Sequence, residues 1–303
     1  MVLRSKVGIT GSSGLLGGHV VSYFLSKKCK VFASSRNRPK IKHKNFFWKK
    51  LDLSKKILHE KLDRAYKDIT CLIHIGAYVP KSQNTTKQNK LNKINVDASL
   101  SLAKWSKKNK IHFIYISGSI IYKHDKKNNE NALILKNSEN IYINSKIRCE
   151  KKILKLFKKN KNVLTILRPS SIYGTGMNKD KLIPKLIKSI KKNKNIIIFN
   201  NQKTYVNFIH AKDVASAIFL SFKLKKTGIF NIGSVNCNNF LSLAKILIKI
   251  LKSKSKISLK IKKKVKSLKS LDVKINKAKA TLKWSPLVTI SKGLKMTVRD
   301  RWI

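Results

Sequence analysis

The side chains in this sequence best suited to proton transfer are a tyrosine and a lysine four residues apart, Tyr142 and Lys146. Residues at this spacing in a helix project from the same face, so the two side chains are predicted to lie together. A cation beside a phenol favours the phenolate and lowers the tyrosine pKa from its usual value of about 10. Such a tyrosine can act as a general acid or base on a hydroxyl or carbonyl group. In a lysine-rich chain the spacing means little alone, and its weight comes from the surrounding elements.

A glycine-rich turn at residues 10–17 has the features of a phosphate-binding loop. It leaves a predicted strand at residues 6–10 and opens a predicted helix at residues 14–26. Gly11 permits the tight turn, Gly14 lets the backbone approach a pyrophosphate at the helix N-terminus, and Gly17 allows helix and strand to pack closely. The turn therefore predicts a bound dinucleotide that contacts Gly11, Ser13, Gly14, Leu15, Leu16 and Gly17.

The end of the second predicted strand bears on the choice between NAD and NADP. Ser35 occupies the place where a carboxylate would bind the ribose hydroxyls, and Arg36 follows it. An arginine suits a 2′-phosphate both as a charge and as a planar donor. The sequence thus favours NADP over NAD. The alternative is that Arg36 and Arg38 are simply two more cations on a very basic surface.

Apolar strands alternate with amphipathic helices through the first two thirds of the chain. The expected strands are residues 6–10, 30–34, 71–75, 111–117 and 163–168, and the expected helices include 14–26, 91–107 and 142–158. This alternation predicts an α/β fold with a doubly wound parallel Rossmann sheet. Later segments are shorter, with helices expected at 182–192, 212–222 and 242–252 and strands at 196–199, 205–209 and 228–232. We therefore expect a dinucleotide-binding domain over residues 1–168, to which 204–233 return, and a smaller C-terminal α/β substrate-binding domain over 169–303.

The charge of the chain is extreme, with 69 lysines and arginines against 13 aspartates and glutamates. The lysines are spread over nearly every expected helix, and there is no basic tail or zinc finger. This distribution favours a composition bias over a specific nucleic-acid surface. The positive field would still attract anionic substrates such as nucleotide sugars.

Other features narrow the class of protein. No apolar run approaches the ~18 residues of a membrane span. The four scattered cysteines have neither metal-ligand nor disulfide spacing, which predicts a cytoplasmic protein without a metal site. His74 and His210 fall within expected strands and are interpreted as packed structural residues.

Together these motifs resemble the extended short-chain dehydrogenases/reductases, the NAD-dependent epimerase/dehydratase family, over essentially the whole chain. Further segments carry the resemblance: residues 51–53, 72–77, 95–96, 168–174, 207–215, 230–233 and 282–286. The resemblance implies a sugar epimerase or reductase, acting on a nucleotide-linked sugar. Tyr142 would take a hydroxyl proton while C4 of the sugar passes a hydride to NAD(P)+. The further cofactor contacts that it implies are Asp52, Leu53, Ile75, Gly76, Ala77, Asn95 and Pro169, besides Tyr142 and Lys146.

The sequence also departs from the family pattern. The usual third catalytic group, a serine or threonine four residues before the tyrosine that ends the strand, falls here on Gly118. Ser117 and Ser119 flank it, and we favour Ser119 because it lies further out of the strand. Sugar 4,6-dehydratases carry acidic residues next to this hydroxyl, whereas this chain has Ile120 and Ile121. Val206 replaces an arginine that often binds a diphosphate.

Two other functions remain open at this point: an NADPH-dependent carbonyl reductase that acts on a non-sugar substrate, and a dinucleotide-binding regulator without turnover. Family resemblance also implies a possible homodimer through the helices at residues 91–107 and 142–158.

Overall fold

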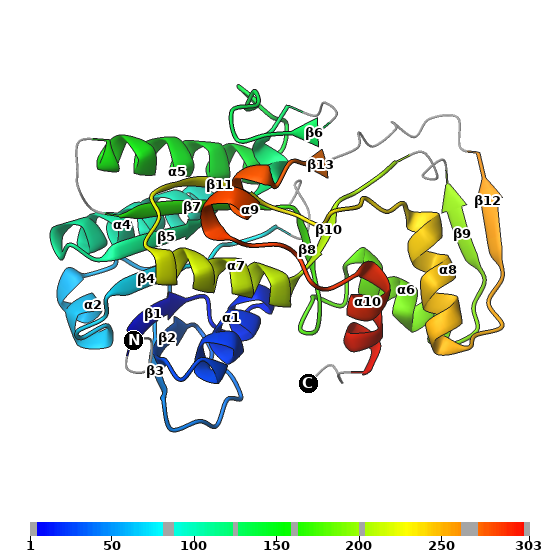
Figure 1. Cartoon of the computed structure of the whole chain (residues 1–303), viewed down its shortest axis with the longest axis horizontal. Helices are drawn as coiled ribbons and strands as arrows, with labels where there is room; N and C mark the ends of the chain where they lie inside the picture. The colour runs from blue at the N-terminus through cyan, green and yellow to red at the C-terminus, as the bar shows by residue number, and fades with distance from the viewer. Residues whose placement is uncertain are drawn as a thin grey trace.

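The computed structural model describes residues 5–80, 88–123, 127–158, 163–199, 204–261 and 272–299. Its centre is a seven-stranded parallel sheet in the order β11-β7-β5-β4-β1-β2-β3 (Figure 1). Its strands are β1 (Lys6–Thr10), β2 (Lys30–Ser35), β3 (Phe46–Lys50), β4 (Cys71–His74), β5 (His112–Ile116), β7 (Leu164–Pro169) and β11 (Gly228–Ile232). The doubly wound Rossmann sheet expected from the sequence is confirmed.

Helices cover both faces of this sheet, because strands buried on both faces need apolar partners on each side. One face packs against α1 (Leu15–Ser26), α7 (Ala211–Leu224) and α9 (Asn276–Leu282). The other packs against α2 (His59–Ala65), α4 (Ala98–Lys108) and α5 (Ile141–Phe157). All residues of β4, β5 and β7 are buried, as this arrangement requires.

A second, smaller cluster lies beyond the carboxyl ends of the large sheet, at the right of Figure 1. Strands β9 (Ile196–Phe199) and β12 (Ile257–Lys260) pair in parallel, and helices α6 (Leu182–Lys191), α8 (Phe240–Leu251) and α10 (Ile290–Arg299) pack beside them. In α6 the buried Ile183, Ile187 and Ile190 recur at helical spacing. Short strand pairs complete the fold: β8 (Ser171–Tyr173) with β10 (Phe208–His210), and β6 (Lys127–Asn128) with β13 (Asp272–Val273).

The chain returns to the large sheet after its first excursion into the smaller cluster. Strand β11 pairs with β7, and α7 lies against α1 (Figure 1). Within the segment 204–233, α7 and β11 therefore pack with the large sheet. In the described part of the chain, no helix is both long enough and apolar enough to cross a membrane.

The secondary structure differs from expectation in specific places. The helix expected at residues 91–107 begins as α3 (Gln88–Asn92), passes through a π-helical turn, η1 (Lys93–Asp97), and continues as α4. Strand β10 lies at 208–210 instead of 205–209. Elements β3, α2, β12, α9 and α10 were not expected. The first four are short or lysine-rich and offer little apolar periodicity, whereas α10 was missed although Ile290, Leu294 and Val298 recur at helical spacing. Part of the lysine-rich stretch at residues 252–270 forms β12, whereas its residues 262–270 lie outside the described residues.

Candidate functional site

A cleft of about 450 Å³ opens at the carboxyl ends of the parallel strands. It lies where the strand order reverses between β1 and β4, the place at which open α/β sheets bind ligands. Predicted residues from distant parts of the sequence line it: Gly11, Ser13, Gly14, Leu15, Leu16, Gly17, Ser35, Arg36, Asp52, Leu53, Ile75, Gly76, Ala77, Ser117, Tyr142 and Lys146.

The glycine turn forms one wall of the cleft, and its backbone packs closely against itself and against the backbone of Gly76. Gly11 has φ +72°, and a Cβ there would lie 2.6 Å from the Gly76 Cα. A Cβ on Gly17 would lie 2.0 Å from the Gly11 carbonyl oxygen. Gly14 is the N-cap of α1, and Ser13, Gly14 and the first turn of that helix line the cleft, where its free N–H groups are available. This cradle fits the pyrophosphate of a dinucleotide.

The ends of β2 and β3 form the part of the cleft expected to hold the adenosine ribose. Ser35 is buried, and its hydroxyl donates to the Asn37 carbonyl at 2.6 Å and accepts from the Trp48 indole N–H at 3.0 Å. Arg36 is exposed and lines the cleft. Asp52 accepts hydrogen bonds from the Ser54 N–H and hydroxyl, and these bonds hold the pKa of its carboxyl below its usual value.

Helix α5 carries the Tyr142–Lys146 pair into the opposite wall. The Asn140 side chain caps the helix by accepting from the backbone N–H groups of Tyr142, at 3.0 Å, and Ile143, at 3.4 Å. The cap starts the helix just before the tyrosine, so that Tyr142 and Lys146 share the face that lines the cleft. The Lys146 ammonium donates to the Ile116 carbonyl at 2.9 Å.

The protonation of this pair differs from the sequence-based expectation. Burial raises the pKa of Tyr142 to about 12, and it lowers the pKa of Lys146 to about 8. The expected lowering of the tyrosine pKa is therefore not found in the structure, where the ammonium is bound to a backbone carbonyl. At neutral pH the tyrosine is a neutral phenol.

Three other predicted site residues lie outside the cleft lining. Asn95 is buried in η1, where its carboxamide binds the backbone N–H and carbonyl of Tyr78 at 2.7 and 3.0 Å. Pro169 ends β7, and Ser119 begins the short 3₁₀ helix η2 (Ser119–Ile121). Their assignments as cofactor-binding or catalytic residues stay predictions.

The two serines differ in what their positions allow. Ser117 and Ser119 are both buried, and neither hydroxyl has a hydrogen-bond partner within the described residues. An unpaired buried hydroxyl is costly, which points to a partner supplied by a ligand. Only Ser117 faces the cleft with Tyr142, so the geometry favours Ser117, whereas the sequence favoured Ser119.

We expect Ser117→Ala to lower kcat by about 10²–10³, the usual effect of losing a donor to the transition state. Ser119→Ala is the matched control, because it removes an equally buried and equally unpaired hydroxyl away from the cleft. Steady-state turnover of both variants checks this. A larger loss in Ser119→Ala would return the role to Ser119.

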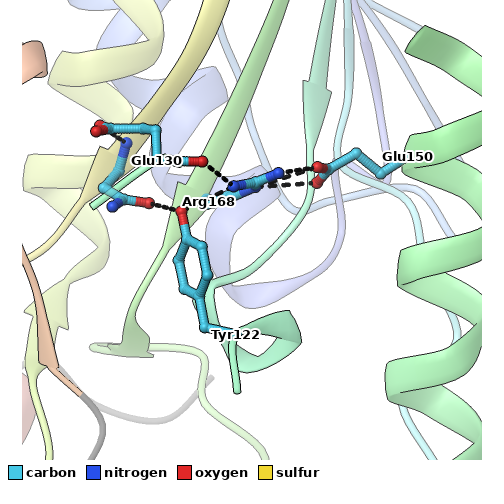
Figure 2. Close-up of polar contacts among 5 residues, drawn as sticks. Tyr122, Glu130, Glu150 and Arg168 are labelled. Carbon is cyan, nitrogen blue, oxygen red and sulfur yellow. Dashed lines mark hydrogen bonds and ion pairs between the residues drawn. The ribbon is translucent and has the colours of Figure 1, made fainter. Parts of the chain in front are cut away.

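A buried ion pair between α5 and the large sheet joins several elements (Figure 2). The Arg168 guanidinium, at the end of β7, binds both carboxylate oxygens of Glu150 in α5. It also donates to the Tyr122 hydroxyl at 2.8 Å and to the Glu130 carbonyl at 3.1 Å. The Tyr122 hydroxyl in turn donates to Asn231 of β11 at 2.7 Å. The network thus fixes α5 relative to the sheet one helical turn beyond Lys146.

Several cleft-lining residues were not identified from the sequence. Those at strand ends, Thr10, Ser34 and Ile116, follow from the rule that ligands bind at the carboxyl edge, once each strand is placed. Leu51 and Ile172 lie in the segments 51–53 and 168–174 that carry the family resemblance, although neither was named as a contact. The others come from loops and short helices whose fold the sequence pattern does not predict: Ser54, Tyr78, Val79, Lys90 and Ile94.

Comparison with known proteins identifies the family. Residues 7–233 match the family model described as "NAD dependent epimerase/dehydratase family". The chain belongs to this family. The match covers the glycine turn and the Tyr142–Lys146 pair, which line the cleft, and it also covers the returning strand β11.

Relatives in the family include a curated dTDP-D-glucose 4,6-dehydratase of Dictyostelium discoideum, 28% identical over 271 residues. That match covers 81% of this chain and 62% of the relative, so the chain spans less than two thirds of the relative's length. Among solved structures, the UDP-glucose 4-epimerase of Thermotoga maritima is 20% identical with a TM-score of 0.84, covering 97% of each chain. The UDP-glucuronic acid 4-epimerase of Bacillus cereus, in complex with UDP-glucuronic acid and NAD, is 22% identical with a TM-score of 0.83, covering 97% of this chain and 98% of that one. These two similarities establish the fold.

Proposed function

We propose that this protein is an NAD(P)-dependent enzyme that oxidises and reduces a sugar carbon, and that this carbon is C4 of a nucleotide-linked sugar. The observation that carries the proposal is that the glycine cradle and the Tyr142–Lys146 pair line one cleft. Family membership supports it, and so do relatives named as nucleotide-sugar epimerases and dehydratases. NAD is named in the B. cereus structure, which supports a nicotinamide cofactor for this chain.

The residues present fit such a cofactor. The backbone around Gly11 and Gly17 leaves no room for side chains, as close approach of a pyrophosphate requires. When bound, the nicotinamide supplies the hydride acceptor and donor. Oxidation requires Tyr142 as the phenolate, which takes the proton of the sugar hydroxyl, and reduction uses the resulting phenol in the cleft wall, which returns the proton. Lys146 places a positive charge on the same face, and Ser117 offers a free hydroxyl to the substrate oxygen.

The charges of the cleft favour epimerisation or reduction over dehydration. Elimination of water needs an acid that protonates the leaving hydroxyl. Among the described residues that line the cleft, Asp52 is the sole carboxylate, and it follows β3 on the cofactor's adenosine side. Positions 120 and 121 beside the serines are isoleucines. We therefore propose that the chain retains the hydride chemistry of its dehydratase relatives without their elimination step.

The cofactor is proposed to be NADP in preference to NAD, because Arg36 lines the cleft and Ser35 replaces a carboxylate. We expect Arg36→Ala to weaken NADPH binding roughly tenfold, since it removes a charge-assisted contact to phosphate. NADH binding should change by less than about twofold. Fluorescence titration of both reduced cofactors measures this. Arg38→Ala is the control, because Arg38 is exposed and does not line the cleft. Equal losses in the two variants, or tighter binding of NADH by the wild type, would reject the preference.

The substrate and assembly complete the proposal. We propose that residues 169–303, apart from the returning 204–233, hold the nucleotide part of the substrate. The homodimer through α4 and α5 stays a prediction. The outward side of α5 exposes Arg148, Lys151, Lys152 and Lys155, so that such a dimer would need counterions between its halves.

The proposed function is tested by a screen of the purified protein with UDP-glucose, UDP-N-acetylglucosamine, UDP-glucuronic acid and dTDP-glucose. Each is combined with NAD+ and NADP+, and absorbance of the reduced nicotinamide is followed together with product analysis for the C4 epimer. Simple ketones with NADPH form a separate arm. Turnover of ketones alone would indicate that the substrate is a non-sugar carbonyl compound. Cofactor binding without any turnover would indicate a regulator.

A further inference from the structure

A chain of buried polar groups crosses the dinucleotide-binding domain directly behind the cleft. It runs from the strand end before the glycine turn, through His74 of β4, to the helix that follows η1. The His74 Nδ1 lies 2.7 Å from the Thr10 hydroxyl, and its Nε2 lies 2.7 Å from the Ser99 hydroxyl. The Thr10, His74 and Ser99 side chains are all buried. Neither ring nitrogen of His74 faces the cleft, so the histidine has no direct part in binding or chemistry.

The partners of the two hydroxyls determine where each proton lies. Ser99 donates its proton to the Asn95 carbonyl at 2.9 Å, and a carbonyl can only accept. The Ser99 oxygen must therefore accept from His74, which places the imidazole proton on Nε2. The unprotonated Nδ1 then accepts from the Thr10 hydroxyl, whose oxygen accepts from the Gly76 N–H at 3.3 Å. All hydrogen bonds of the chain run in one direction, from Gly76 to Asn95.

The imidazole stays neutral over the working range of pH. Burial, together with the nearby charge of Lys146, lowers the pKa of His74 to about 3. A neutral imidazole has one donor and one acceptor, which is what this position requires. The ring is also held by stacking against Phe113 and Tyr115 at 6.2 and 5.9 Å between centroids.

The two ends of the chain reach the two halves of the cleft. At one end, Gly76 lies against Gly11, where an added Cβ would come within 2.6 Å, so the position of Gly76 sets the clearance of the cofactor cradle. At the other end, the Asn95 carboxamide holds the Tyr78 backbone and donates to the Ser145 hydroxyl at 3.1 Å. Ser145 donates to the Tyr142 carbonyl at 2.7 Å.

We propose that His74 is a positioning residue that couples the cofactor cradle at Gly76 to the catalytic helix at Tyr142 through this oriented chain of hydrogen bonds. The proposal rests on the proposed function, because it assigns His74 a role in cofactor binding and turnover. Loss of the hydrogen bond between His74 and Thr10 should free Gly76 and thereby alter the shape of the cofactor cradle. Loss of the hydrogen bond between His74 and Ser99 should loosen Asn95 and thereby shift the loop at Tyr78 and the helix that carries Tyr142.

Two substitutions of His74 separate these halves. The shorter side chain in His74→Asn places a carbonyl oxygen where Nδ1 accepts from Thr10, but it cannot reach Ser99. The longer one in His74→Gln places an amide N–H where Nε2 donates to Ser99, but it loses the acceptor for Thr10. We expect His74→Gln to weaken NADPH binding about tenfold while kcat stays within about threefold of the wild type. We expect His74→Asn to lower kcat about tenfold while NADPH binding stays within about threefold. Kd is measured by fluorescence titration, and kcat with UDP-glucose at saturating cofactor.

His112 provides matched controls. It is also a buried histidine with a lowered pKa, and its Nε2 lies 2.9 Å from the Thr165 hydroxyl, at the opposite end of the strands from the cleft. His112→Asn and His112→Gln should lower the melting temperature as the His74 variants do, yet change Kd and kcat by less than about twofold. Equal effects of the two His74 variants on both constants, or effects no larger than those of the His112 variants, would overturn the coupling. Ser99→Ala, a milder change, should reproduce the effect of His74→Asn.

The proton arrangement is checked without turnover by ¹⁵N NMR of histidine-labelled wild-type protein. The proposal requires the Nε2–H tautomer for His74, and an Nδ1–H tautomer would overturn it. Wild-type protein that binds neither NADH nor NADPH would instead contradict the proposed function, and the tautomer would still report on the hydrogen-bond chain. The two failures are therefore distinguishable.

Discussion

Tyr142→Phe is expected to lower kcat by about 10²–10⁴ while cofactor affinity stays within about twofold of the wild type. The substitution removes a single hydroxyl from the cleft wall and leaves the ring in place, so that proton transfer is lost and packing is kept. Turnover is measured with the best nucleotide sugar of the screen, and affinity by titration with the reduced cofactor.

Two variants complete this test. Tyr23→Phe is the control, because Tyr23 lies on α1 outside the cleft lining, and its removal should leave kcat unchanged. Lys146→Ala should reduce both kcat and cofactor affinity, and it should move the pH–rate profile for oxidation to more alkaline values. The reason is that proton uptake requires the phenolate of Tyr142, whose pKa burial already raises to about 12, and loss of a positive charge from the same cleft wall should disfavour the phenolate further. Full activity of Tyr142→Phe would remove the tyrosine from the mechanism.

Arg168→Met is expected to destabilise the fold by about 3–5 kcal/mol at neutral pH, because it leaves the buried Glu150 carboxylate without its partner. The free energy of unfolding is measured by denaturant titration.

The matched control is the exposed pair of Lys6 and Asp68, 2.9 Å apart. Lys6→Met should change stability by less than about 1 kcal/mol, since exposed ion pairs contribute little. The double variant Arg168→Met with Glu150→Leu should be more stable than Arg168→Met, because it removes both charges. A double variant no more stable than Arg168→Met would show that Glu150 is not the source of the cost.

The part of the site that the sequence predicts well is the part carried by short segments. The glycine turn and the Tyr142–Lys146 pair each lie within eight consecutive residues, so their types and spacing specify local geometry directly. The strand alternation then places both at one edge of the sheet, because parallel strands point the same way. The parallel sheet and the cleft follow from these two facts, whereas the edge strand β3 does not.

The remainder depends on contacts between residues distant in sequence. No spacing predicts that Arg168 meets Glu150 and Tyr122, or that His74 lies between Thr10 and Ser99. The preference for Ser119 rested on its position further out of the strand. The chain turns into η2 at Ser119, however, and Ser117 is the serine that lines the cleft. The tyrosine pKa likewise depends on burial, which a two-residue motif does not report. Short lysine-rich elements such as β12 were missed because their apolar residues are too few to show a period.

The measurement that tests the central proposal most directly follows a deuterium atom placed at C4 of the nucleotide sugar that the enzyme converts. The protein is incubated with the labelled sugar and its cofactor, and the label is located by mass spectrometry and NMR. We predict that the deuterium passes to the nicotinamide ring, and that it either remains there or returns to C4 of the product. No transfer should occur with Tyr142→Phe. Release of the deuterium into water would contradict hydride transfer at C4 and, with it, the proposed function.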